Sequence, residues 1–229
     1  MVGNLTRVWQ EWRGFLLFIA VMLIFRSAIA DWNQVPTGSM IPSILAGDRI
    51  VVDKTAYDLR IPFTFVRLAQ WADPARSDVI TFESPKDGRL LVKRVIGIPG
   101  DTVELNNNTL SINDEHANYT PLSRVDVPEE LTTVFAHVDI AKETILGKSR
   151  MVMTQRHQHS QTRSSFGPIT VPASNYLVLG DNRDNSQDSR FIGFVGRDLI
   201  LGRAKSIAFS LDYDNYYVPR GDRFFRDLD

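Results

Sequence analysis

The chain has 229 residues, of which 43% are hydrophobic and 23% charged, a balance that excludes a disordered chain and allows a sizeable core. The net charge is −1 and the basic residues are dispersed, so there is no electrostatic footprint for nucleic acid. Cysteine is absent, which excludes disulfides, a thiol nucleophile and cysteine-ligated metals.

The first predicted element is an apolar segment near the N-terminus. Residues 14–25, GFLLFIAVMLIF, are unbroken by charge, and basic residues precede them. Counting on to Ala30 gives seventeen residues, which is short against the roughly 20 of a typical membrane span. Two interpretations stay open: a transmembrane anchor over residues 14–31, or a cleavable signal peptide ending at Ala28-Ile29-Ala30. In both, residues 1–13 stay cytoplasmic and the remainder is exported.

Beyond residue 31 the sequence predicts short strands separated by glycine, proline and asparagine turns. The expected strands are residues 49–53, 78–82, 89–96, 102–105, 109–112, 176–179 and 199–209, the last with a glycine bulge. Only residues 129–138 have mild helical character. We therefore expect a mainly β fold, a partly closed antiparallel barrel or sheet, preceded by one N-terminal transmembrane helix.

One internal segment breaks this pattern. Between residues 113 and 166 the strand signal weakens, and residues 155–165, QRHQHSQTRSS, are polar without periodicity. We expect 113–166 to be an inserted subdomain with an exposed loop, and 32–112 with 167–229 to form the main domain.

The histidines, the usual general bases, are poorly placed for catalysis. His157 and His159 form an H-x-H pair that could bind a metal, but they lie in the polar stretch without a third ligand at suitable spacing, which favours solvated loop residues. The acidic run 181–188 fails the EF-hand template in ligand order. No G-x-S-x-G motif surrounds a serine, so a nucleophile elbow is not indicated.

Lys93 is the more interesting candidate. In LLVKRVI, residues 90–96, strand alternation places it on one face between Leu91 and Val95. A lysine at a strand edge is most often exposed as protection against aggregation. A buried lysine, in contrast, would have a lowered pKa and could accept a proton from a serine hydroxyl.

Four stretches together resemble the bacterial type I signal peptidases, which are membrane-anchored serine proteases. They are, in the order found in that family, PTGSMIPSI (36–44), GDRIVVDK (47–54), KRVIGIPGD (93–101) and GDNRDNSQDSRFIGFV (180–195). The apolar segment followed by Arg26-Ser27 is similar to the family's anchor. The resemblance covers the anchor and most of the β-rich core, and leaves only 113–166 without a matching motif.

The resemblance implies a serine–lysine dyad. Ser39 corresponds to the nucleophile and Lys93 to the general base, while Ser186 corresponds to a serine that hydrogen-bonds the lysine. The hydroxyl of Thr37 and the backbone N–H of Ser39 would form the oxyanion hole, with threonine standing where many relatives have serine.

The resemblance also implies supporting residues. Asp188 and Arg190 correspond to an ion pair behind the site. The residues that correspond to shallow apolar pockets for small substrate side chains are Val35, Met40, Ile44 and Val92.

The function implied is removal of signal peptides from exported preproteins by cleavage after small residues in an A-x-A pattern. No cofactor or metal is expected, and the partners are signal peptides and the lipid bilayer. The family retains its anchor, which favours a single-pass protein of the bacterial inner membrane with the catalytic domain on the periplasmic side. The alternatives are a related serine–lysine maturation peptidase of a conjugation or secretion system, or an exported β-rich binding module without catalysis.

Overall fold

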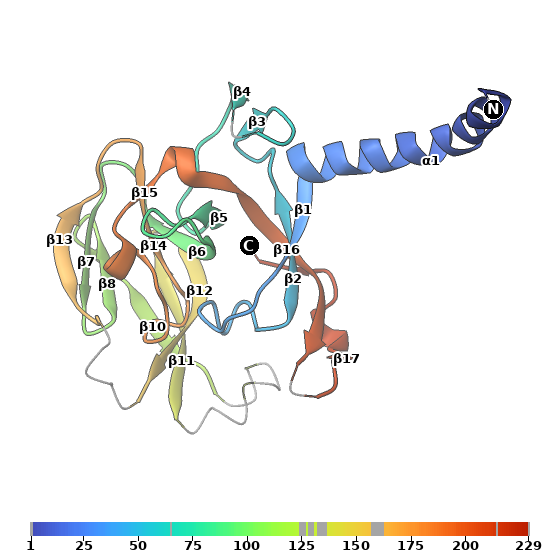
Figure 1. Ribbon diagram of the computed structural model, residues 1–229. Helices are drawn as coiled ribbons and strands as arrows, with labels where there is room; N and C mark the ends of the chain where they lie inside the picture. Colours follow the sequence, from blue (N-terminus) through green and yellow to red (C-terminus); the bar gives the residue numbers. More distant parts are fainter. Residues whose placement is uncertain are drawn as a thin grey trace.

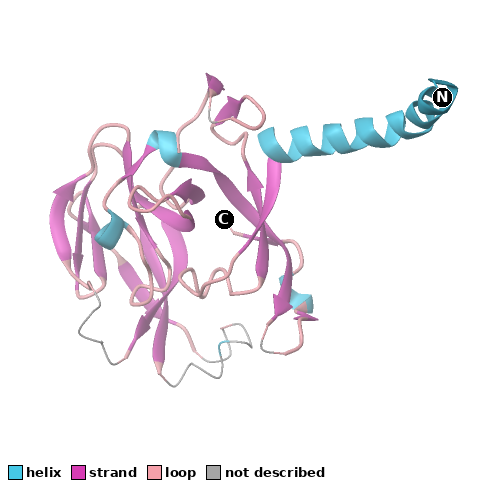
Figure 2. Ribbon diagram, in the orientation of Figure 1, coloured by secondary structure: helices cyan, strands magenta, loops and turns pink. Residues whose placement is uncertain are grey.

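The β-rich part of the molecule forms one body, from which a single long helix projects (Figures 1 and 2). The structure, a computed structural model, describes residues 2–64, 66–123, 127, 131, 137–156, 163–213 and 215–228. Most of the predicted helical residues 129–138 lie outside these ranges. Both histidines of the H-x-H pair, His157 and His159, also lie outside them. The mainly β prediction is confirmed.

Within the described residues, the central sheet contains nine strands. Along its main path the order is β1-β2-β16-β5-β6-β14-β15, and the short β17 and β18 also pair with β16. The path ends at β1 and β15, so the described strands form an open sheet and not a closed barrel. The strands are β1 (Ala30–Gln34), β2 (Asp48–Asp53), β5 (Val79–Glu83), β6 (Leu90–Gly97), β14 (Asn175–Leu179), β15 (Val195–Gly196), β16 (Ile200–Asp212), β17 (Val218–Pro219) and β18 (Arg226–Asp227).

Three smaller sheets surround the central one. Their orders are β13-β7-β8-β9, β10-β11-β12 and β3-β4. The strands are β3 (Asp58–Arg60), β4 (Arg67–Gln70), β7 (Thr102–Asn106), β8 (Thr109–Ile112), β9 (Glu115–His116), β10 (Asn118–Pro121), β11 (Val138–Ile145), β12 (Lys148–Gln155) and β13 (Phe166–Thr170).

The predicted strands form where apolar residues lie between turns, and their burial alternates in β2 but extends to both faces in β5. In β2, Ile50 and Val52 are buried while their neighbours are partly exposed, which gives one core-facing side. The bulge predicted in the last long strand is also present, since the pairing of β16 with β5 shifts register between Ile200 and Gly202. A Cβ at Gly202 would lie 2.6 Å from the carbonyl oxygen of Asp53, so glycine is needed where the β2 backbone approaches.

The segment predicted as a separate insertion is joined closely to the rest of the fold. Val138, Ile140 and Met153, on β11 and β12, pack with Leu45 in one hydrophobic cluster. Met153 also forms a parallel bridge with Asn182 of the GDNR stretch. The described part of 113–166 therefore contributes to the core and to the loop that follows β14, while its boundaries as a unit stay a prediction.

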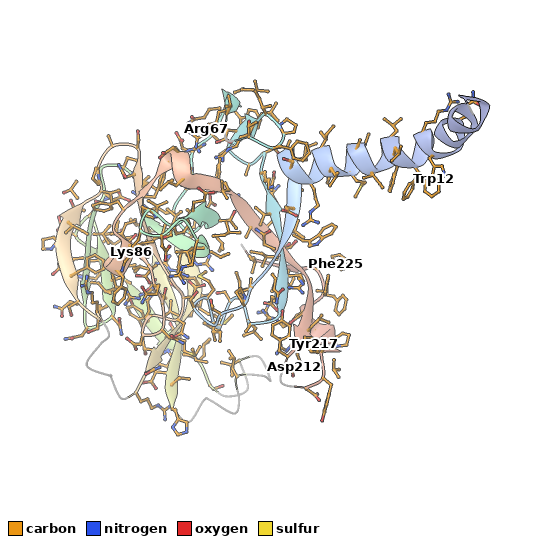
Figure 3. The ribbon with its side chains drawn as sticks, viewed as in Figure 1. Trp12, Arg67, Lys86, Asp212, Tyr217 and Phe225 are labelled. Atoms are coloured by element: carbon orange, nitrogen blue, oxygen red, sulfur yellow. The ribbon has the colours of Figure 1, made fainter. Side chains whose placement is uncertain are left out.

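The helix α1 (Val2–Ala28) begins earlier than the apolar run that predicted it. Its side chains from Trp12 to Phe25 project from all sides, away from the β-rich body, as Figure 3 shows for Trp12. Among the described residues, no helix combines the length and the apolar character required to cross a membrane.

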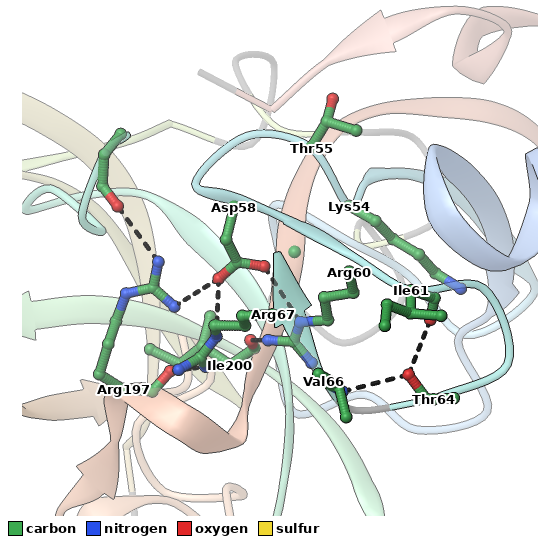
Figure 4. Close-up of polar contacts among 12 residues, drawn as sticks. Lys54, Thr55, Asp58, Arg60, Ile61, Thr64, Val66, Arg67, Arg197 and Ile200 are labelled. Carbon is green, nitrogen blue, oxygen red and sulfur yellow. Dashed lines mark hydrogen bonds and ion pairs between the residues drawn. The ribbon is translucent and has the colours of Figure 1, made fainter. Parts of the chain in front are cut away.

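A buried carboxylate fixes the small β3-β4 sheet to the core (Figure 4). Asp58 is 2% exposed and contacts three guanidinium groups, those of Arg60 and Arg67 at 3.0 Å and that of Arg197 at 2.9 Å. Arg197 precedes β16, so one carboxylate joins the hairpin to the central sheet. Removing it would leave buried cations without their anion, which is far more costly than losing an exposed pair.

We expect Asp58→Ala to lower the free energy of unfolding by about 3–5 kcal/mol, measured by urea denaturation. The matched control is Asp139→Ala, which breaks the exposed ion pair with Arg156 and should cost less than about 1 kcal/mol. Equal effects of the two substitutions would contradict the structural role of Asp58.

Candidate active site

Ser39 and Lys93 are brought together from distant parts of the chain. Ser39 lies in the turn between β1 and β2, and Lys93 lies in the middle of β6. The Lys93 Nζ donates a hydrogen bond to the Ser39 Oγ at 2.7 Å and another to the carbonyl oxygen of Val92 at 2.9 Å. A nucleophile and a base within this distance satisfy the geometric requirement for proton transfer.

Lys93 is 3% exposed, so its ammonium form is poorly solvated. Burial lowers the pKa of Lys93 from 10.5 to about 8, although the negative charges of Asp188 and Asp181 act in the opposite direction. A substantial fraction of the side chain is therefore neutral in weakly alkaline solution and able to accept a proton.

The GDNR stretch holds the Ser39 turn from behind. The Asn182 side chain donates to the Gly38 carbonyl at 3.0 Å, and its backbone N–H donates to the Ser39 carbonyl at 3.1 Å. A Cβ on Gly180 would lie 2.5 Å from the Ser39 carbonyl oxygen and 2.3 Å from the Ser186 Oγ. Only glycine allows the two segments to pack at this distance, and Asn182 is a positioning residue that the sequence did not reveal.

Asp188 and Arg190 form a buried ion pair at 2.8 Å at the end of the same loop. Asp188 also accepts a hydrogen bond from the Gly180 N–H at 3.0 Å. The Arg190 guanidinium donates in turn to the carbonyl oxygens of Arg183 and Arg163. One carboxylate thus closes the loop between residues 180 and 190.

Ser186 lies in the same loop and is buried, but its expected hydrogen bond with Lys93 is not formed. Within the described part of the chain, the Ser186 Oγ has no hydrogen-bond partner. Its role in orienting the lysine stays a prediction, although its place beside Gly180 and the Ser39 backbone puts it next to the dyad.

The dyad opens into one cleft of about 590 Å³. Thr37, Ser39, Lys93 and Ser186 all border it, and Thr37 is exposed to it. In the described ranges, no hydrogen bond uses the Ser39 N–H, which leaves that donor free for a ligand. Sequence reasoning missed several other lining residues, namely Arg89, Leu91, Gln155, Arg163, Arg183, Asp184 and Phe191.

The four residues expected to form substrate pockets are placed differently. Val35, Met40 and Ile44 are at most 4% exposed and pack in one core cluster, against which the partly buried Val92 also packs. The cleft, as the described residues outline it, has none of the four among its lining side chains. Their apolar side chains pack in the core. A contact of these residues with substrate stays a prediction.

A second buried ion pair braces the turn on the other side of Ser39. Arg223 and Asp48 are both 0% exposed, with the Arg223 Nε at 3.0 Å and its Nη2 at 2.6 Å from the carboxylate oxygens. Asp48 accepts the Leu45 N–H, and Arg223 donates to the Ser43 carbonyl. The turn that carries Ser39 is therefore anchored at its exit by a residue from the C-terminal segment.

Buried charges also connect the GDNR stretch to the segment 113–166. Glu143 on β11 is fully buried between Arg150 and Arg183. Burial alone would raise the pKa of Glu143, but the two guanidinium groups hold it below its usual value. Glu143 and Arg150 lie outside the recognisable motifs. The only sequence signal for their role is that each is a charged residue within a strand whose other residues alternate.

Comparison with known proteins gives the family. The signal peptidase family, peptidase S26, matches residues 9–209. The chain belongs to this family. It is accordingly a serine endopeptidase. The match includes both Ser39 and Lys93.

Individual relatives agree. Signal peptidase I from Pseudomonas aeruginosa is 33% identical over 86% of this chain and 71% of its own length, and that from Rickettsia bellii is 33% identical over 88% and 73%. Signal peptidase I from Buchnera aphidicola is 29% identical over 93% of this chain and 78% of its own. A crystal structure of a signal peptidase I from Enterococcus faecalis is 31% identical and covers 58% of this chain and 97% of that chain, with a TM-score of 0.35.

Peptidase activity is expected to rise with pH and level off above about 8, because a lysine that accepts the Ser39 proton has to be neutral. If Lys93 were exposed and had the ordinary pKa of 10.5, the rise of activity with pH would be centred near pH 10.5 instead. The measurement is kcat/KM for a peptide substrate across the range from weakly acidic to strongly alkaline solution. A profile that is flat through this range would exclude Lys93 as the base.

Proposed function

We propose that the protein removes signal peptides from exported preproteins, cleaving after small residues in an A-x-A pattern with a Ser39–Lys93 dyad. The observation that carries this proposal is the 2.7 Å hydrogen bond between a serine hydroxyl and a buried lysine in the same cleft. A carboxylate or histidine beside Ser39 would have favoured another protease mechanism. The activity of the relatives supports the choice of substrate.

The proposed reaction proceeds in two halves. The Ser39 Oγ attacks the carbonyl carbon of the scissile bond while Lys93 accepts the hydroxyl proton, and the protonated lysine then donates that proton to the leaving amine. The acyl-enzyme that results is attacked by water, whose proton passes to Lys93. Lys93 returns it to the Ser39 Oγ as the acyl group leaves, so the dyad regains its starting protonation.

The oxyanion of each tetrahedral intermediate needs donors that are free in the resting protein. The Ser39 N–H is free in this sense, and the Thr37 hydroxyl borders the same cleft. Together they form the oxyanion hole that we propose. Such donors act strongly because they are already oriented before charge develops.

We propose further that α1 holds the catalytic domain at the bacterial inner membrane, on the periplasmic side. The support is the exposed apolar surface of the helix, including Leu17, Phe18 and Val21 at 65%, 62% and 55% exposure. A helix that is apolar all round is not suited to water. The apolar segment is short, and snorkelling of Arg26 toward the interface would extend its reach.

The decisive test uses the full chain in vesicles and a fluorogenic preprotein-derived peptide with an A-x-A site. We expect Ser39→Ala and Lys93→Met each to lower kcat by at least about 10³-fold, since the two groups act as a unit. Both variants should still sediment with the membranes. Lys86→Ala, at an exposed lysine of the β5-β6 loop, is the control and should retain wild-type turnover.

Turnover at the wild-type rate by Ser39→Ala would refute the dyad. Retained activity on a substrate with Phe in place of the final Ala would refute the small-residue preference but leave the dyad intact. Extraction of the wild-type protein by alkaline carbonate would refute the anchor alone.

Thr37 offers a separate test of the oxyanion hole. Thr37→Val keeps the shape but removes the hydroxyl, so we expect kcat to fall by about 10²–10³-fold with little change in KM. Thr37→Ser retains the donor and should stay within about threefold of wild type. Equal activities of the valine and serine variants would show that the hydroxyl does not contact the oxyanion.

A further inference from the structure

A second cavity, of about 550 Å³, lies on the opposite face of β6 from the catalytic cleft. Arg94 lines this cavity whereas Lys93 lines the cleft, and consecutive residues of a strand point to opposite faces. The cavity is bordered by β12 and by β18, so it lies between strands that are distant in sequence. It contains none of the residues proposed for catalysis.

The lining of this cavity is strongly basic. Among the described residues that line it, seven are arginine or lysine and two, Asp78 and Asp227, are acidic, but Arg76, Arg94, Arg150 and Arg203 are each paired with a carboxylate, so three of the cations remain unpaired. The whole chain, in contrast, has a net charge of −1. A concave surface lined by one sign of charge concentrates counter-ions of the other sign. The unpaired positive charge at this cavity therefore favours an anion over a neutral or cationic ligand.

Two of these cations are buried in the cavity wall. Arg94 is 4% exposed and its guanidinium is occupied by Asp181, Ser77 and Ser43. Arg150 is 7% exposed and is less well satisfied, since its Nε has no hydrogen-bond partner among the described residues. Burial and the neighbouring positive charges of Arg183 and Arg94 lower the pKa of Arg150 against the effect of Glu143. An added negative charge would relieve this repulsion.

Three further cations lie at the cavity with their charges free. Lys142, Lys148 and Arg226 have no ion-pair partner within the described part of the chain. Lys142 and Lys148 are exposed, so they can close over a bound group without disturbing the core. Buried arginines at the back and exposed lysines at the mouth are the arrangement that suits an anion with several oxygens.

We propose that this cavity binds a phosphate group, either free or as the headgroup of an anionic phospholipid. Phosphate presents three or more acceptor oxygens, which matches several converging donors better than a chloride or a single carboxylate does. A smaller cavity of about 210 Å³ shares Arg76, Ser77, Lys148 and Arg150 with the first and is otherwise lined mainly by apolar side chains. A lipid could place its glycerol or acyl portion there, whereas inorganic phosphate would leave it empty.

The test is titration calorimetry on the full chain in a phosphorus-free detergent at constant ionic strength, with three probes: inorganic phosphate, monomeric short-chain phosphatidylglycerol and short-chain phosphatidylcholine. We expect saturable binding of phosphate or of phosphatidylglycerol by the wild-type protein. Lys142→Gln with Lys148→Gln should weaken it by about tenfold, as expected for the loss of charge-assisted hydrogen bonds.

Lys148→Gln and Lys86→Gln form the matched control pair, since each removes one exposed lysine and only the first borders the cavity. The first should weaken binding and the second should leave it unchanged. Binding of phosphatidylglycerol alone identifies a lipid headgroup, and equal binding of both anions identifies a site for free phosphate.

Four results would overturn the proposal: no saturable binding of either inorganic phosphate or phosphatidylglycerol, binding of phosphatidylcholine as tight as that of the anionic probes, wild-type affinity in the Lys142→Gln, Lys148→Gln double variant, or equal weakening by Lys86→Gln. Because the probes bind without any peptide being cleaved, these results are independent of whether the Ser39–Lys93 dyad is correct.

Discussion

The burial of one ammonium group governs the organisation of this molecule. Lys93 could be exposed at the edge of a sheet at no cost, but here it is almost fully buried and 2.7 Å from the Ser39 hydroxyl. Desolvation makes its neutral form accessible in weakly alkaline solution, and the neutral form is the one that can take a proton. The surrounding structure has to keep water out and also hold Ser39 at hydrogen-bonding distance.

Buried ion pairs and backbone contacts hold Ser39 at hydrogen-bonding distance from Lys93. Asn182 holds the backbone of the Ser39 turn, and Gly180 lets the loop approach closely enough to do so. Asp188 then closes that loop, while Glu143 ties its beginning to β11 through Arg183. A buried charge without its partner is costly, so each pair favours one arrangement of the loop over its alternatives.

The motif-bearing parts were predictable from sequence because their signals are local. Short apolar runs between turn residues indicated β2, β5 and β6, and the turn residues around 106–108 indicated the β7-β8 hairpin. The closeness of Ser39 and Lys93 could be anticipated only from the family resemblance, because their contact spans 54 residues of sequence. Composition and periodicity carry no information about such a pairing.

The parts that could not be predicted depend on long-range contacts. β11 and β12 contain five charged residues beside seven apolar ones, and the buried Glu143 and Arg150 are held by the ion pairs that Glu143 forms with Arg150 and Arg183. Val35, Met40 and Ile44 were expected at the substrate, but the core around β2 and β16 surrounds them. The basic cavity is likewise invisible in sequence, since its cations come from segments spread between residues 76 and 226.

The ion pair between Asp48 and Arg223 has a consequence for the time at which the Ser39 turn is completed. The two residues are 175 positions apart, and Asp48 is synthesised long before its partner. Until Arg223 has left the ribosome, the turn that carries Ser39 lacks its brace and Asp48 has no buried counter-charge. The turn that carries Ser39 therefore takes its final form only after Arg223 has been synthesised and has packed against Asp48.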